Sequence, residues 1–338
     1  MSELKGYKEE IFEQIANEYP DLGKSRINEF NQILGGADTT IYGFDLISDS
    51  KSIPLILRIY RPNYSASAKW EYTVMRNLHA EGIQVPRPYL FNEESSTTGR
   101  AYFVMERING PLLSDELFAS RSTPRFDQLL ELFVRNLVAI HSVDWTKGFS
   151  FLDRYDIAEN PHLFFKYELS SPMRIIKEHG VDDLIPVIDW METNQLDLGA
   201  PCLLHADYHA MNNLVRNSDE IITIDWANAK LGDCRYDLGF AVMALDSMGF
   251  DQREQLVSLY EEISGQKIQH LEYFMVLSAL WNLLRIYSCA FDHGIMGESE
   301  ETANLFLNDY RPYAVKVVRT AQETTGVSLA KLLDVLEQ

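Results

Sequence analysis

The stretch Leu203–Leu238, LLHADYHAMNNLVRNSDEIITIDWANAKLGDCRYDL, decides how this chain folds and what chemistry it can carry. It holds His205, Asp207, Asn212 and Asp225 in a strict order, and a short alternating segment separates the last two. Such an order allows a chain to bring one carboxylate base and two oxygen ligands for a metal ion to the same point.

The segment between Asn212 and Asp225 predicts a β-hairpin. Leu214–Arg216 has the pattern of a short strand. Asn217–Glu220 is typical of a turn, because Asn, Asp and Ser bond their own backbone and tolerate tight turns. The β-branched run Ile221–Ile224 indicates a returning strand. Because paired strands lie roughly 5 Å apart, side chains just outside the two arms can reach a common cation.

The three oxygen-bearing side chains fit phosphoryl transfer. The amide of Asn212 and the carboxylate of Asp225 are hard ligands, and Mg²⁺ takes few protein ligands and completes its shell with water and phosphates. Asp207 lies five residues before Asn212 and can accept the proton of an attacking hydroxyl. Because catalysis of phosphoryl transfer is mainly positioning and charge neutralisation, this arrangement provides what the reaction needs.

Three motifs in this stretch resemble those of the aminoglycoside phosphotransferase-like (choline kinase-like) small-molecule kinases. HADYHAMNN (His205–Asn213) resembles their catalytic loop H-G-D-x-H-x-x-N, and IDW (Ile224–Trp226) resembles their metal motif I-D-[WF]. LGDCRYDLG (Leu231–Gly239) resembles the G-D-P-x-x-D-L-A segment that follows. Ala206 stands for the usual Gly and Cys234 for the usual Pro, and both changes leave the acidic and amide groups intact.

The resemblance implies an α+β, bilobal protein-kinase-like fold with a small β-rich N-lobe and a larger, mainly helical C-lobe. We expect residues 1–108 to form the first lobe and residues 109–338 to form the second, with the catalytic loop, metal site and substrate pocket. The resemblance also implies ATP and Mg²⁺ as cofactors, Asp207 as catalytic base, and magnesium ligation by the two residues that flank the hairpin. Asp237 is expected to support the catalytic loop.

Two features of the N-terminal third suit nucleotide phosphates. Gly35 and Gly36 open a turn before a strand at Thr40–Leu46, at the place of a phosphate-covering loop, although a plain hairpin turn gives the same pattern. Arg58 lies inside an apolar strand and needs a partner there, which Glu71 on the following helix can supply. This pair corresponds to the strand-lysine/helix-glutamate pair of kinases; a surface Arg on an edge strand is the alternative.

The expected hinge follows these elements. Val85–Phe91 is interpreted as a proline-punctuated linker and Ala101–Glu106 as a strand. We expect adenine to bond main-chain groups near Met105, Glu106 and Arg107, where a kinase-like fold has its hinge.

From about Asp115 the pattern becomes helical. Helices are expected at Phe126–His141, Asp251–Ser264, Leu271–Cys289, Arg311–Thr320 and Ser328–Glu337, and helices within Phe149–Asn194 are expected to wall a substrate pocket. Only eleven residues separate Asp225 from Asp237, which is too short for a long regulatory loop. The acceptor is therefore expected to be a small molecule rather than a protein.

The net charge of −20 restricts the partners. Residues 1–108 hold 15 acidic and 12 basic side chains, whereas residues 109–338 hold 35 and 18. An acidic surface repels nucleic acid and anionic membrane, so neither is expected as a partner. The acidity favours a cationic acceptor at the larger lobe, although solubility alone explains an acidic composition equally well.

Composition also bears on location. Three cysteines without metal-ligand spacing indicate free thiols in a reducing compartment. The N-terminus has no apolar signal core, so a cytoplasmic location is expected. The apolar run Tyr273–Phe291 is interrupted by Asn282 and Arg285, which favours a buried helix over a membrane span.

The sequence therefore predicts an ATP-dependent phosphotransferase that moves the γ-phosphoryl group to a hydroxyl of a small, amino-bearing molecule, as aminoglycoside phosphotransferases do. The alternatives are a kinase of a macrolide, a choline-like alcohol, homoserine or a sugar, and a catalytically silent nucleotide-binding module. The intact Asp207, Asn212 and Asp225 argue against the silent module. The acceptor, the choice between ATP and GTP, the oligomeric state and the roles of His205 and His209 stay open.

Overall fold

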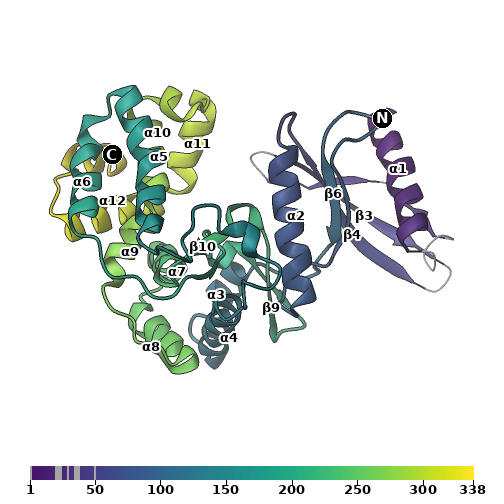
Figure 1. Cartoon of the computed structure of the whole chain (residues 1–338), viewed down its shortest axis with the longest axis horizontal. Coiled ribbons are helices and arrows are strands. Elements are labelled where there is room, and N and C mark those ends of the chain that lie inside the picture. Colours follow the sequence, from purple (N-terminus) through teal and green to yellow (C-terminus); the bar gives the residue numbers. More distant parts are fainter. Residues whose placement is uncertain (1, 20–24, 29, 34–38, 49–50) are drawn as a thin grey trace. The chain divides into compact units, whose positions relative to one another are not determined.

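The computed structural model describes residues 2–19, 25–28, 30–33, 39–48 and 51–338. These residues form two compact units: residues 1–121 with 211–229, and residues 122–210 with 230–338. An antiparallel sheet in the N-terminal part and a mainly helical C-terminal part confirm the expected α+β class (Figure 1). The division after residue 108 stays a prediction.

The described residues of the first unit include a sheet, the α-helices α1 to α3 and a hairpin. Its helices are α1 (Ser2–Glu18), α2 (Ser65–Ala80) and α3 (Leu113–Ser120). The sheet strands are β1 (Arg26–Ile27), β2 (Asn31–Ile33), β3 (Thr39–Ile47), β4 (Ser52–Tyr60), β5 (Pro88–Asn92) and β6 (Tyr102–Glu106), in the order β1-β3-β4-β6-β5 with β2 paired to β3. The described strand pairs of this sheet are antiparallel.

Alternation along β4 decides which side chains meet which helix. Leu55 and Leu57 belong to the core cluster that also contains Tyr7 and Ile11 of α1. Successive side chains on a strand point to opposite faces, so the residues between them face the other way. Helix α2 lies on that opposite face of the sheet (Figure 1). Arg58 is one of these residues, which turns its guanidinium toward α2.

The predicted hairpin is confirmed. Strand β8 (Asn213–Arg216) pairs antiparallel with β9 (Glu220–Thr223). The turn between them uses left-handed backbone at Asn217 (φ 52°) and Ser218 (φ 69°). Asn in particular tolerates this conformation, because its short polar side chain bonds locally.

The second unit is built mainly from helices. These are α4 (Pro124–His141), α5 (Leu163–His179), α6 (Ile185–Thr193), α7 (Arg235–Ser247), α8 (Arg253–Ser264), α9 (Leu271–Ser278), α10 (Leu280–Phe291), α11 (Glu300–Asp309), α12 (Arg311–Thr325) and α13 (Ala330–Leu336). A two-stranded sheet pairs β7 (Cys202–Leu204) with β10 (Lys230–Gly232). The two strands of this small sheet flank, in the sequence, the segment that contains the predicted catalytic loop and metal motif.

Two expected elements were wrong. Val85–Phe91 is not only a linker, because β5 begins at Pro88 and pairs with β6. Proline lacks an N–H and is tolerated at the first residue of a strand, so it does not exclude one here. Leu271–Cys289 is not one helix but α9 and α10, bent by 48°. The hydroxyl of Ser278 donates to the carbonyl of Met275, a bond that competes with regular helix geometry.

Among the helices that the structure describes, none is by itself long and apolar enough to cross a membrane, and only the bent pair α9–α10 meets the criteria when its members are taken together.

Candidate functional site

The expected ion pair between Arg58 and Glu71 is present in the first unit. Arg58 Nη1 lies 2.5 Å from Glu71 Oε1, and Arg58 Nη2 lies 3.1 Å from Asp225 Oδ1. The Tyr60 hydroxyl donates to the second oxygen of Glu71. Glu71 is fully buried, and burial raises the pKa of its carboxyl while the Arg58 guanidinium opposes the rise. The Arg58 guanidinium therefore links strand β4, helix α2 and Asp225 beyond the hairpin.

Asn212 and Asp225 lie at the open end of the hairpin. The last pair of the ladder is Asn213 with Thr223, and beyond it the Ile224 N–H donates to the Asn212 carbonyl at 2.9 Å. Asp225 has left-handed backbone (φ 65°), and its side chain is 43% exposed. Backbone pairing thus continues up to the two predicted metal ligands and fixes their main-chain positions.

The donor chemistry of these two residues fits magnesium. An amide oxygen and a carboxylate are hard ligands, and the ion normally takes only one or two protein carboxylates with water and substrate phosphates. Within the described residues, no group of three or more His, Cys, Asp or Glu side chains is arranged to hold a metal ion. Magnesium ligation by Asn212 and Asp225 stays a prediction.

The predicted catalytic loop is held by a buried carboxylate of the second unit. Asp237 on α7 accepts the backbone N–H of His205 at 2.7 Å and that of Ala206 at 2.8 Å. The ring of His141 lies 3.3 Å from the same carboxylate and 2.8 Å from the Tyr260 hydroxyl. Sequence reasoning expected Asp237 to support the loop, and the hydrogen bonds show the contact by which it can do so.

The loop turns sharply before Asp207. Ala206 has left-handed backbone (φ 64°), which explains why glycine is usual at this position of the motif. His205 is buried, and its Nδ1 accepts the Asp207 N–H at 3.2 Å. A ring nitrogen that accepts carries no proton, so the geometry gives His205 a part in shaping the loop.

Asp207 itself is accessible. Its side chain is 31% exposed, and one carboxylate oxygen lies 3.5 Å from His209 Nε2. The next residue is anchored, because the Tyr208 hydroxyl donates to the Phe133 carbonyl at 2.8 Å and the two rings stack. The loop therefore presents one carboxylate from a fixed backbone.

Comparison with known proteins agrees with this architecture. The model of the phosphotransferase enzyme family matches residues 29–270. The chain belongs to this family. Spectinomycin phosphotransferase in complex with ADP and spectinomycin has a similar fold, with a TM-score of 0.57 and 17% identity over 94% of this chain and 98% of that one.

Two further solved structures share the fold. A protein of Ralstonia eutropha JMP134, provisionally assigned as an aminoglycoside phosphotransferase, has a TM-score of 0.66 and 18% identity over 88% of this chain and 92% of that one. An aminoglycoside phosphotransferase with AMP-PNP and hygromycin B has a TM-score of 0.54 and 15% identity over 95% of this chain and 99% of that one.

Curated relatives are distant and longer. Acyl-CoA dehydrogenase family member 11 of Rattus norvegicus is 24% identical over 282 residues, 75% of this chain and 35% of that protein. The protein of the same name in Homo sapiens is 22% identical over 288 residues, 78% of this chain and 36% of that protein. The chain thus spans about a third of the length of these relatives.

The predicted nucleotide contacts are only partly described. Gly35 and Gly36 lie outside the described residues, so their role over the phosphates stays a prediction. Near the expected hinge, the Glu106 N–H donates to the Arg87 carbonyl and the Arg107 N–H donates to the Pro54 carbonyl.

These bonds reduce the number of main-chain groups that adenine can contact in this segment. Two N–H groups that already donate within the unit are poor partners for the base. Adenine contacts at Met105–Arg107, which stay a prediction, must therefore use other main-chain groups of this segment.

Sequence reasoning missed a charged pair near the loop. The Lys230 ammonium lies 2.7 Å from Glu168 on α5 and 4.5 Å from the ring centre of Tyr236. The charges of both Glu168 and Asp207 act on the buried Tyr236 hydroxyl, whose pKa is raised mainly by burial. No local pattern marks this pair, because its members lie 62 residues apart in the chain.

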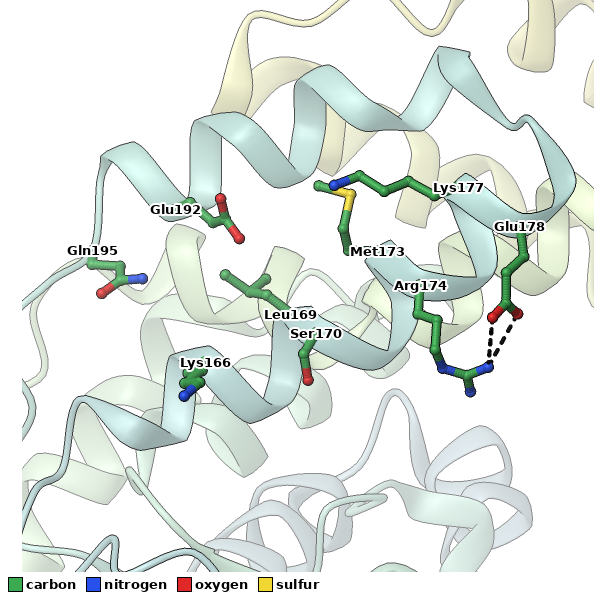
Figure 2. Close-up of a pocket in the computed structure, with 9 residues that line it drawn as sticks. All are labelled: Lys166, Leu169, Ser170, Met173, Arg174, Lys177, Glu178, Glu192 and Gln195. Atoms are coloured by element: carbon green, nitrogen blue, oxygen red, sulfur yellow. Dashed lines mark hydrogen bonds and ion pairs between the residues drawn. The ribbon is translucent and has the colours of Figure 1, made fainter.

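Helices α5 and α6 border a cavity of about 580 Å³ (Figure 2). It is lined by Lys166, Leu169, Ser170, Met173, Arg174, Lys177, Glu178, Glu192 and Gln195. Arg174 is paired with Glu178 (Figure 2). Helical spacing puts most of these residues on the side of α5 opposite Glu168, so the cavity is not evidence for where an acceptor meets Asp207.

Replacing Glu71 by Gln should lower the free energy of unfolding by about 3 kcal/mol, because it leaves the buried Arg58 without its main counter-charge. Urea denaturation measures this. The control is Glu131→Gln, which breaks an exposed pair with Arg135 and should cost under about 0.5 kcal/mol. Equal losses in the two variants would show that burial does not set the strength of the pair.

Replacing Ala206 by Gly should raise the free energy of unfolding by about 0.5 kcal/mol. Relief of left-handed strain is worth about 1–2 kcal/mol and exceeds the added flexibility of the unfolded chain. The matched control is Ala119→Gly on the exposed face of α3, which should cost about 1 kcal/mol. A loss of stability at both positions would contradict the strain at Ala206.

Proposed function

We propose that this protein is an ATP-dependent phosphotransferase that moves the γ-phosphoryl group to a hydroxyl of a small molecule. The observation that carries the proposal is the catalytic loop, in which Asp237 holds two successive backbone N–H groups and Asp207 stays accessible. Family membership supports the same reaction.

The proposed role of each residue follows from its own unit. Asp207 accepts the proton of the acceptor hydroxyl while the oxygen of that hydroxyl forms a bond to the γ-phosphorus. The bond from that phosphorus to the bridging oxygen breaks, and ADP leaves. Arg58, held in place by Glu71, neutralises phosphate charge, and a guanidinium can bind phosphate oxygens through two N–H groups at once.

Asn212 and Asp225 are the residues that would hold magnesium. A bound ion at this place would neutralise phosphate charge and share its coordination shell with the nucleotide.

An amino-bearing alcohol is the first acceptor we propose. Relatives with the same fold were solved with spectinomycin and with hygromycin B. The acidity of residues 109–338, with 35 acidic against 18 basic side chains, supports a cationic molecule.

An acyl-CoA that carries a hydroxyl group is a second candidate. It is favoured by the curated relatives, whose name identifies them as members of an acyl-CoA dehydrogenase family and of which this chain matches only about a third. A kinase part joined to such an enzyme would act on chemically related molecules. An acceptor panel should therefore contain both classes, together with choline, homoserine, a neutral sugar and a macrolide.

Replacing Asp207 by Asn should lower kcat for acceptor phosphorylation at least about 10³-fold and leave the Kd for ATP unchanged, because the amide keeps the shape but cannot accept the proton. ATP consumption across the panel and nucleotide titration measure the two effects. Asp219→Asn, in the hairpin turn, is the control and should behave as wild type. Wild-type chain that binds ATP but phosphorylates no panel member would favour a silent nucleotide-binding module.

Replacing Asp225 by Asn should raise the Mg²⁺ concentration needed for half-maximal activity about tenfold or more, since a neutral amide binds the ion more weakly than a carboxylate. A magnesium titration at fixed ATP measures this, and chelation by EDTA should abolish turnover in the wild type. Retention of the wild-type titration curve would rule out Asp225 as a ligand.

A further inference from the structure

One buried hydroxyl in the second unit has no use in the reaction described so far. Tyr313 lies in the first turn of α12, and its hydroxyl oxygen is covered without a hydrogen-bond partner among the described residues. A buried donor without an acceptor is rare in proteins and calls for an explanation. Burial raises the pKa of this hydroxyl, and the charge of Asp207 raises it further, so it remains a proton donor.

A series of contacts connects Tyr313 to the catalytic base. Its ring packs edge-on against Phe240 of α7, with ring centres 6.4 Å apart. Phe240 packs against His209, with ring centres 5.9 Å apart, and His209 lies 3.5 Å from the Asp207 carboxylate. Asp207 is the charged group that raises the pKa of the Tyr313 hydroxyl beyond the effect of burial.

Two buried tyrosines of the same unit have partners for their hydroxyls. The hydroxyl of Tyr208 donates to the Phe133 carbonyl, and that of Tyr273 donates to the Met191 carbonyl. The packing of this unit thus satisfies buried hydroxyls elsewhere and leaves one unsatisfied in the neighbourhood of the base.

We propose that Tyr313 is an acceptor-binding residue, whose hydroxyl donates a hydrogen bond to an oxygen or nitrogen atom of the molecule that Asp207 activates. This inference rests on the proposed function. Acceptor binding must uncover the hydroxyl, for example through a rotamer change of Phe240, whose ring packs against that of Tyr313. Changes of side-chain rotamer on binding are common.

The test compares Tyr313→Phe with wild type, using ATP and the panel acceptor that has the highest kcat/KM. Phenylalanine keeps the ring against Phe240 and removes only the hydroxyl. We expect kcat/KM for the acceptor to fall about tenfold, as for the loss of one hydrogen bond. The KM for ATP should not change, and Tm should not fall, because no bond within the protein is lost.

Tyr273→Phe is the matched control, since its hydroxyl has a partner within the protein. It should lower Tm and leave the acceptor kinetics unchanged. Acceptor kinetics of Tyr313→Phe within twofold of wild type, or a fall in Tm like that of Tyr273→Phe, would overturn the inference and leave the proposed function intact. Failure of the wild type to phosphorylate any panel member would contradict both the inference about Tyr313 and the proposed function.

Discussion

The predicted catalytic loop depends on one buried carboxylate. Asp237 is fully buried and accepts two successive backbone N–H groups, those of His205 and Ala206. Hydrogen bonds to a charged group contribute about 1.5–3 kcal/mol each, and an unpaired buried carboxylate would be very costly. Both N–H groups can point at one side chain only if the backbone turns sharply, which it does at the left-handed Ala206. That turn sets the direction in which Asp207 leaves the loop.

In the first unit a buried positive charge must be paired in the same way. Alternation along β4 turns Arg58 to the face covered by α2, where a guanidinium must be paired. Glu71 supplies the main partner and Asp225 the second. The residue that follows the hairpin is therefore tied to the sheet through a cation that can also bind phosphate. In both units a buried charge that must be paired fixes the position of a residue that we propose to act in phosphoryl transfer.

Features encoded locally could be predicted from the sequence, and features that depend on packing could not. The hairpin follows from turn residues between two β-branched runs, and the Arg58–Glu71 pair follows from one charge inside an apolar strand. Lys230 contacts Glu168 because helix α5 packs against β10, and no spacing in the sequence predicts that contact. An unpartnered hydroxyl such as that of Tyr313 is a property of the packed interior and leaves no sequence pattern.

The choice of acceptor also depends on packing and could not be predicted from local sequence patterns. The proposed roles of the motifs around Asp207, proton acceptance and phosphoryl transfer, do not depend on which molecule carries the hydroxyl. Net charge is a guide to solubility and association, but the charge next to a site is set by specific side chains. Here the Lys230 ammonium neutralises Glu168, and the nearby hydroxyls of Tyr236 and Tyr313 are uncharged. One carboxylate near Asp207 is thus already paired, and a hydrogen-bond donor such as the Tyr313 hydroxyl can act together with the overall acidity of the unit in selecting the acceptor.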